Sequence, residues 1–258
     1  MAKILLIDTS SEVCSAAISV DGSVIAFSEN LEAQSHAALL TLQIAECSTL
    51  AGIPLAQLDA VALSQGPGAY TALRVGASVA KGICYALEKP LIAVNTLLAL
   101  AYASREATGG LDFLEPDSGV KSHDPKLETE GQITTIFAPM LDARRQEIWL
   151  ALYDAELREI APAQPLILEN NSFEKFVLSK IGEKEIYRIV LSGNGMKKTR
   201  SGLVLKGAVF SSIVKCSARH LVELAEQFFQ SVDFQDVAYF EPYYMKPPNI
   251  TTSSKPLF

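Results

Sequence analysis

The stretch SQGPGAYTALRVGASVAKG, residues 64–82, joins a turn rich in glycine and proline directly to a helix rich in small residues. It follows the short apolar run LDAVALSQ and precedes Pro90 and the run LIAV. Strand, helix and strand in this order predict an α/β fold. Upstream, residues 3–30 alternate apolar and polar side chains, with breaks at 8–12 and 21–22. This pattern predicts a three-stranded meander ahead of the α/β unit.

Two helices are predicted around the central stretch. One begins at Ser35 and is stopped by Gly52 and Pro54, and the other covers about 71–87. The first carries two overlapping apolar stripes at helical spacing, which indicates two buried faces. These stripes are Leu39, Leu42 and Ala45, and Leu40, Ile44 and Cys47.

The chain divides into two predicted lobes, residues 1–102 and 103–258. Residues 108–131 break every periodicity with Gly, Pro, Ser and charge, so we expect a mobile surface insertion there. Beyond it, two strands flank a polar turn at 142–145, and a last amphipathic helix covers 217–230. We expect this helix to pack back toward the first lobe, ahead of a Pro-rich, irregular tail.

Composition narrows the function classes. The 258 residues are 49% hydrophobic, with no apolar run long enough for a membrane span and no secretory leader pattern, so we expect a cytoplasmic protein. Four widely spaced cysteines suggest neither a zinc site nor a disulfide framework. A net charge of −7 repels phosphate, which argues against a stand-alone nucleic-acid binder.

The turn at Gly66–Gly68 invites comparison with phosphate-binding loops. A Walker loop needs Gly-Lys followed by Ser or Thr, and the dinucleotide motif needs a third glycine where Ala69, Tyr70 and Thr71 stand. Neither pattern is met. Two interpretations stay open. The backbone amides of this strand-to-helix turn could hold an anion, with Thr71 as the helix cap, or the turn could need its glycines only for a tight geometry.

The helix after this turn has an unusually small face. Ala72, Gly76 and Ala80 repeat every four residues, so a neighbouring element can approach closely. Val75, Val79 and Ile83 form the adjacent stripe. Together with the doubled stripe on the first helix, this predicts a second buried contact beyond the sheet, although packing of the two helices on each other would also account for it.

Several motifs occur in a fixed order: ILLIDTSSEVCSAAI, QSHAALL, the stretch SQGPGAYTALRVGASVAKGICYALEKPLIAVNTLLALA, MLDARRQEIWLALYD and GNG. Together they resemble the TsaB (YeaZ) family, from residue 1 to about 195 apart from the insertion. The terminal EPYYMK also resembles the family's closing element. Two residues depart from the usual family string, Ala69 for serine and Ala72 for glycine, while Arg74 is retained.

The resemblance implies a two-lobed fold of the actin, sugar-kinase and chaperone-ATPase (ASKHA) superfamily, with mixed sheets flanked by helices. It implies a non-catalytic scaffold without cofactor or metal, which binds a TsaD-type catalytic subunit in threonylcarbamoyl transfer to adenosine 37 of tRNA. Further implied partners are a TsaE-type ATPase reached through the heterodimer, a second copy of the chain when alone, and tRNA only indirectly. The predicted partner interface comprises His36, Leu40, Ile44, Arg74, Val75, Gly76, Val79 and Ala80.

An enzyme of the same fold is the alternative hypothesis. It would be a small-molecule kinase or ATPase that places nucleotide at Asp8, Gly66, Gly68 and Thr71. A metal-dependent reaction like that of the paralogue TsaD is not expected, because that enzyme's two metal-binding histidines correspond here to Thr96 and Leu100. Asp8 also suits a polar hairpin turn, and His36 suits a helix cap or an interface residue.

Overall fold

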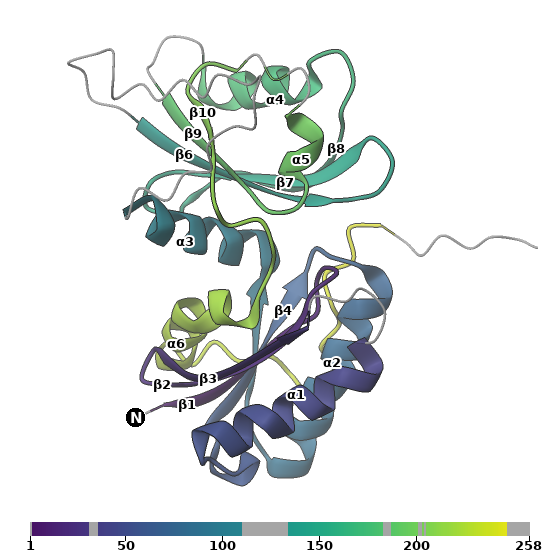
Figure 1. The fold of residues 1–258 in the computed structure, drawn as a ribbon, viewed down its shortest axis with the longest axis vertical. Helices are drawn as coiled ribbons and strands as arrows, with labels where there is room; N and C mark the ends of the chain where they lie inside the picture. Colours follow the sequence, from purple (N-terminus) through teal and green to yellow (C-terminus); the bar gives the residue numbers. More distant parts are fainter. Residues whose placement is uncertain are drawn as a thin grey trace, which may run out of the picture.

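The computed structural model describes residues 2–30, 36–109, 134–182, 187–200, 203 and 205–246. The predicted insertion at 108–131 lies outside this range beyond residue 109. The described residues form two lobes, one above the other in Figure 1, each built on a mixed sheet.

The first sheet has the strand order β3-β2-β1-β4-β5. The antiparallel meander β1–β2–β3 forms as the alternating sequence predicts, and β4 and β5 then add in parallel to β1. The strands are β1 (Lys3–Asp8), β2 (Cys14–Val20), β3 (Ser23–Asn30), β4 (Ala60–Gly66) and β5 (Leu91–Asn95).

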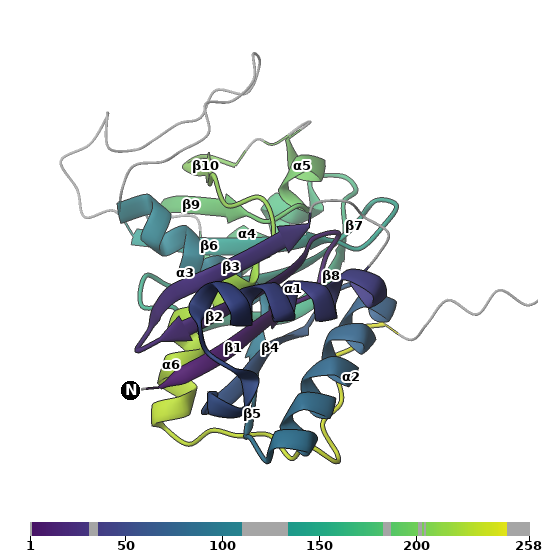
Figure 2. The same cartoon turned by 60° about the horizontal axis from the view of Figure 1, so that its bottom comes forward.

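Both faces of this sheet are covered, because successive side chains of a strand point to opposite faces. Leu5 and Ile7 of β1 pack under α1 (His36–Ala51) and α2 (Tyr70–Leu87), which lie on one face. Ile4 and Leu6 pack on the other face under the helical turn η3 (Ala218–Leu221) and α6 (Val222–Gln230). Figure 2 shows α1 and α2 in front of the sheet. A short turn, η1 (Leu55–Gln57), connects α1 to β4.

The second sheet has the order β10-β9-β6-β7-β8. Its face away from the first lobe packs on α4 (Ser172–Ile181) and α5 (Met196–Thr199), and its other face packs on α3 (Thr96–Gly109). Its strands are β6 (Thr134–Asp142), β7 (Glu147–Tyr153), β8 (Glu159–Ile167), β9 (Tyr187–Ser192) and β10 (Ala208–Phe210).

Two chain crossings join the lobes. The outgoing one is α3, which starts directly after β5 and contributes Leu97 and Leu100 to the core beneath the second sheet. The returning one runs from β10 to η3 and includes Cys216, buried in the same core. The last helix therefore belongs to the first lobe in space, although it follows the second lobe in sequence.

Residues 235–246 lie along the first lobe without helix or strand. The backbone N–H of Gln235 donates to the carbonyl of Leu91, and that of Tyr243 donates to Gln65. The ammonium of Lys81 on α2 binds the carbonyls of Ala238 and Phe240 at 3.0 Å each. In the part of the chain that the structure describes, no helix is both long and apolar enough to cross a bilayer.

Candidate functional site

The β1–β2 turn and the Gly-Pro-Gly loop before α2 pack directly on each other. The backbone N–H of Ala69 donates to the carbonyl of Ser10 at 2.8 Å. A Cβ added to Gly68 would overlap this same carbonyl oxygen, so only glycine allows the approach. Ser10 in turn donates to the carboxylate of Asp8 through its N–H (2.9 Å) and its hydroxyl (2.8 Å). The turn and the loop therefore form one locked joint.

The C-terminal segment closes the loop from its other side. Gly66 has φ +115°, and a Cβ there would come within 2.6 Å of the carbonyl oxygen of Tyr243. The N–H of Tyr243 donates to Gln65 at 2.7 Å. To hold an anion, the loop would have to present backbone N–H donors. The groups that face the loop here are the carbonyl oxygens of Ser10 and Tyr243. The opening turn is thus a tightly packed joint, and the anion site at this turn stays a prediction.

Three of the four residues of the predicted anion site, Asp8, Gly66 and Gly68, lie around this joint. Thr71, the fourth, is exposed on the first turn of α2. Asp8 is buried, and burial raises the pKa of its carboxyl to about 6, against the opposing effect of the two Ser10 hydrogen bonds. Beside it, burial also raises the pKa of the Cys216 thiol. These groups line a sealed interior.

The lobes are bridged by Asn194 of the sequence GNG. Its Nδ2 donates to the carboxylate of Glu12 in the β1–β2 turn at 2.7 Å, and its Oδ1 accepts the N–H of Asp142 at 2.9 Å. Asp142 also accepts a bond from Lys198 at 2.7 Å. The sequence predicted the turn at 142–145, but it gave no signal that Glu12 and Asn194 would meet across the two lobes.

Four of the eight predicted interface residues are buried on the inner faces of the two helices. Leu40 and Ile44 are 0% and 3% exposed and belong to the core under α1, Ala80 packs in the same core, and Gly76 faces Thr9 of the β1–β2 turn. This corrects the expectation that the doubled stripe of α1 leaves these side chains for a partner. The small face of α2 accommodates Thr9, whose hydroxyl donates to the carbonyl of Ala72 at 2.8 Å.

The remaining predicted interface residues lie at the edge or on the outside of the helix pair. Arg74 is exposed, while Val75 and Val79 are half-buried against the core of the first lobe. Nε2 of His36 lies 3.0 Å from the carbonyl oxygen of Ser11, so this residue ties the start of α1 to the β1–β2 turn.

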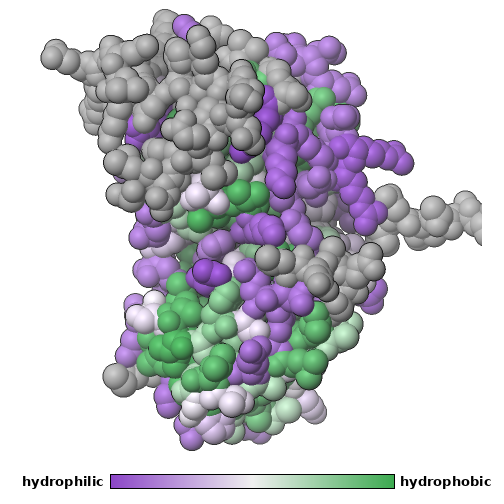
Figure 3. Space-filling view, in the orientation of Figure 1, coloured by the Kyte–Doolittle hydropathy of each residue, from purple (hydrophilic) through white to green (hydrophobic). Residues whose placement is uncertain are grey.

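The outer faces of the two helices carry large apolar side chains, and Figure 3 shows hydrophobic surface, in green, on the lobe that holds them. Leu42 and Leu50 of α1 are 64% and 63% exposed, and Tyr85 of α2 is 84% exposed. Sequence reasoning placed Leu42 in an apolar stripe but missed Leu50 and Tyr85. The scarcity of charge in α1, described below, is the signal that would have found this surface.

The two mixed sheets, the helices between and around them and the return of α6 to the first lobe define a two-lobed α/β protein. YeaZ from Pseudomonas aeruginosa has the same fold, with a TM-score of 0.72 at 22% identity over 95% of this chain and 100% of that one.

Sequence comparisons are more specific than the fold. The chain is 34% identical over 112 residues to the tRNA threonylcarbamoyladenosine biosynthesis protein TsaB of Escherichia coli, which is 43% of this chain and 48% of that protein. It is 36% identical over 103 residues to the TsaB of Haemophilus influenzae, or 40% and 43% of the two chains. The family model for TsaD, tRNA N6-adenosine threonylcarbamoyltransferase, matches residues 30–116.

The chain is therefore similar in sequence to TsaB proteins, the resemblance that its ordered motifs predict. The aligned regions span about half the length of the curated relatives. The match to the TsaD model covers α1, β4, α2, β5 and α3, so this likeness lies in the first lobe and the outgoing crossing.

Proposed function

We propose that this protein is a non-catalytic subunit in tRNA threonylcarbamoyladenosine biosynthesis. It binds a TsaD-type catalytic subunit through the outer faces of α1 and α2 and supports threonylcarbamoyl transfer to adenosine 37 of tRNA. The observation that carries this proposal is the near absence of charge on an exposed helix, α1.

Helix α1, His36–Ala51, contains one charged residue, Glu46. The hydroxyl of Ser28 donates to its carboxylate at 2.6 Å, so this charge is held by the first lobe. The exposed positions around Leu42 are otherwise alanines, threonines and Leu50. A surface helix normally carries charged residues on its outer face, and a helix that is apolar or uncharged all round is usually buried. A partner that covers α1 would account for this composition.

The outer face of α2 is shaped for close approach. Its exposed positions include Thr71, Arg74, Ser78, Gly82 and Tyr85, which recur every three or four residues. A Cβ added to Gly82 would meet no atom within 4 Å, so this glycine borders open space. Ser78 and Gly82 are small and leave room for a facing helix. They lie between Arg74 and Tyr85, and arginine and tyrosine are typical anchor residues of protein interfaces.

A TsaD-type partner fits because the TsaD model matches the segment that holds both helices. Two chains that share a helix pair can meet through a pseudo-two-fold contact, in which equivalent surfaces face each other. The same surface supports a homodimer when the partner is absent. In this proposal, a TsaE-type ATPase and tRNA are reached through the catalytic subunit, and the complex is cytoplasmic.

The non-catalytic role is supported by the first lobe itself. The carbonyls of Ser10 and Tyr243 face the loop in the place of anion donors. Thr96 and Leu100, where the resemblance to TsaD would require histidines, are both buried and cannot coordinate a metal through imidazole.

The experiment measures binding of a TsaD-type protein to the wild-type chain and to Leu42→Glu. A carboxylate at the centre of the outer face should weaken association at least tenfold, because burying it unpaired is unfavourable. Ile167→Glu is the matched control, since Ile167 is 56% exposed on β8 of the other lobe. Wild-type binding by a folded Leu42→Glu variant would overturn the interface.

A separate calorimetric titration with ATP and Mg²⁺ addresses the alternative. Tight binding by the isolated chain would favour a kinase or ATPase over the scaffold. This measurement is independent of partner association, so the two parts of the proposal can fail separately.

A further inference from the structure

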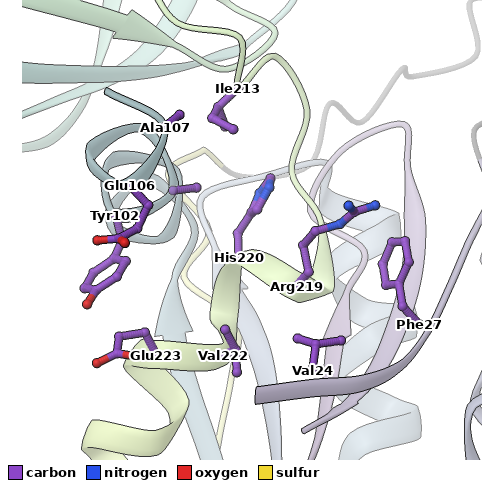
Figure 4. A pocket seen from close by; sticks show the side chains of 11 residues that line it. Val24, Phe27, Tyr102, Glu106, Ala107, Ile213, Arg219, His220, Val222 and Glu223 are labelled. Carbon is purple, nitrogen blue, oxygen red and sulfur yellow. The ribbon is translucent and has the colours of Figure 1, made fainter. Parts of the chain in front are cut away.

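A cavity of about 640 Å³ lies on the face of the first sheet opposite to α1 and α2. It is bounded by β3, by α3 and by the η3–α6 segment (Figure 4). Ile213, on the chain crossing that returns from the second lobe, borders it as well. Both connections between the lobes therefore contribute to its wall. We call it the hinge cavity.

A β-bulge turns one side chain into the hinge cavity. Between Ile18 and Ser19 the register of β2 with β3 shifts, so that Ala26 pairs with Ile18 and Val24 pairs with Ser19, leaving Ile25 as the extra residue. Without the bulge, Val24 would lie on the sheet face opposite to Phe27, because strand side chains alternate. With it, Val24 and Phe27 both line the cavity. Bulges commonly redirect a side chain in this way beside functional sites.

One wall presents a polar group without a partner. The imidazole of His220 points into the hinge cavity between α3 and β3 (Figure 4). Its Nδ1 is buried and has no hydrogen-bond partner among the described residues. Burial, and to a smaller extent the neighbouring Arg219, lowers the pKa of His220 to about 4, so the ring is neutral near pH 7. Because Nδ1 itself is not accessible, His220 offers the cavity a neutral aromatic ring.

The charges around the hinge cavity disfavour an anion. Two carboxylates, Glu106 and Glu223, line it together with one guanidinium, that of Arg219. The Arg219 guanidinium lies 4.1 Å from the ring centroid of Phe27 and 3.7 Å from the carboxylate of Glu29. Its positive charge is thus already paired with Glu29, which does not line the cavity. The local field favours a neutral or cationic group.

The cavity volume lies within the range typical of small-molecule sites, which combine apolar walls with a few polar groups that fix orientation. We propose that the hinge cavity binds a small, largely apolar and neutral or singly cationic molecule, which occupies the space between Phe27 and Ala107 and contacts the imidazole ring of His220. Such a ligand contacts β3, α3 and the return crossing together, and so restrains the two lobes relative to each other. The site is separate from the α1–α2 surface and does not depend on the proposed function.

The test uses 9-aminoacridine, a planar aromatic cation, as a fluorescent probe of the full chain. Saturable binding is expected, at least tenfold tighter than binding of 9-anthracenecarboxylate, which has a similar ring system and the opposite charge. Ala107→Trp, which fills the cavity, should weaken binding at least tenfold, and Ile167→Trp on the exposed β8 strand should leave it unchanged. His220→Ala, which removes the aromatic ring from the cavity wall, should weaken it severalfold.

Folding of each variant is checked by thermal melting, and Ala103→Trp replaces Ala107→Trp if the latter does not fold. The chain has three histidines, so the ring nitrogens of His220 can be followed by NMR in ¹⁵N-histidine-labelled protein. A shift of these resonances on probe addition is expected. Absence of saturable binding, equal binding of the carboxylate, or equal binding by the cavity-filling variant would each overturn the proposal.

Discussion

The hydroxyl of Thr9 lies in the space that a side chain on Gly76 would occupy, while it donates to the carbonyl of Ala72 one helical turn earlier. Helix α2 is thereby held against the β1–β2 turn through a single glycine. Thr9 is buried and bonded, so it has little freedom to move aside.

Gly76→Ala should therefore destabilise the fold by about 1–3 kcal/mol through overpacking, even though alanine is the better helix former by about 1 kcal/mol. Chemical denaturation measures this change. Combining it with Thr9→Ala should give less than the sum of the two single effects, because the added methyl group then has room. Additive effects, or no loss of stability in Gly76→Ala, would show that the contact is not limiting.

Gly82, six residues further along the same helix, is expected to behave in the opposite way. Gly82→Leu introduces a better helix former into open space, so the monomer should melt at or above the wild-type temperature. The same leucine stands between α2 and a facing helix, and association with a TsaD-type protein should fall at least tenfold. Gly82→Ala serves as the control with a smaller side chain. Unchanged association of Gly82→Leu would place the partner elsewhere.

The contrast between these two glycines shows where sequence reasoning ends. The 3.6-residue period predicts α1 and α2 well, because their apolar positions recur over four turns. It does not say which stripe of an almost uncharged helix faces the sheet, so Leu40 and Leu42 look equivalent until the strands are in place. The joint at Ser10 and the Glu12–Asn194 bridge join residues far apart in the chain, which local patterns cannot anticipate.

The strand at residues 159–167 illustrates a different limit. Its sequence EIAPAQPLI contains two prolines, which normally argue against a strand, and none was predicted there. In the structure it is β8, at the end of its sheet, where one side of the strand needs no ladder donors. Position in the sheet, which the sequence does not display, decides whether proline is tolerated.

Asp8→Asn should change how stability depends on pH. The folded-state pKa of about 6 exceeds the ordinary 3.8, so the stability that Asp8 contributes is full below about pH 3.8 and is lost as the pH rises through 6. Asparagine retains an oxygen for the two Ser10 donors and cannot ionise. The variant should exceed the wild type by about 3 kcal/mol at pH 7, and the difference should vanish near pH 3.5. Unfolding titrations from pH 3.5 to 7.5 test this, and a constant difference would contradict it.

Asn194→Ala should loosen the lobes. It removes a charged hydrogen bond to the Glu12 carboxylate, which contributes about 1.5–3 kcal/mol, and a neutral one from the backbone N–H of Asp142, which contributes about 0.5–1.5 kcal/mol. The melting temperature should fall, and amide exchange should rise in the β1–β2 and β6–β7 turns. Glu12→Ala should have a similar effect, with little further loss in the double variant. Unaltered exchange in both turns would mean that the bridge does not restrain the lobes.

The uncharged outer face of α1 also bears on how long the protein survives in a cell. Quality-control proteases and chaperones capture exposed apolar segments, and a modest change in the exposed population alters abundance severalfold. A chain that conceals this helix only when assembled would be removed when made in excess. On the proposed assembly, the steady-state amount of this subunit would then follow that of its partner, with no shared transcriptional control needed to match the two.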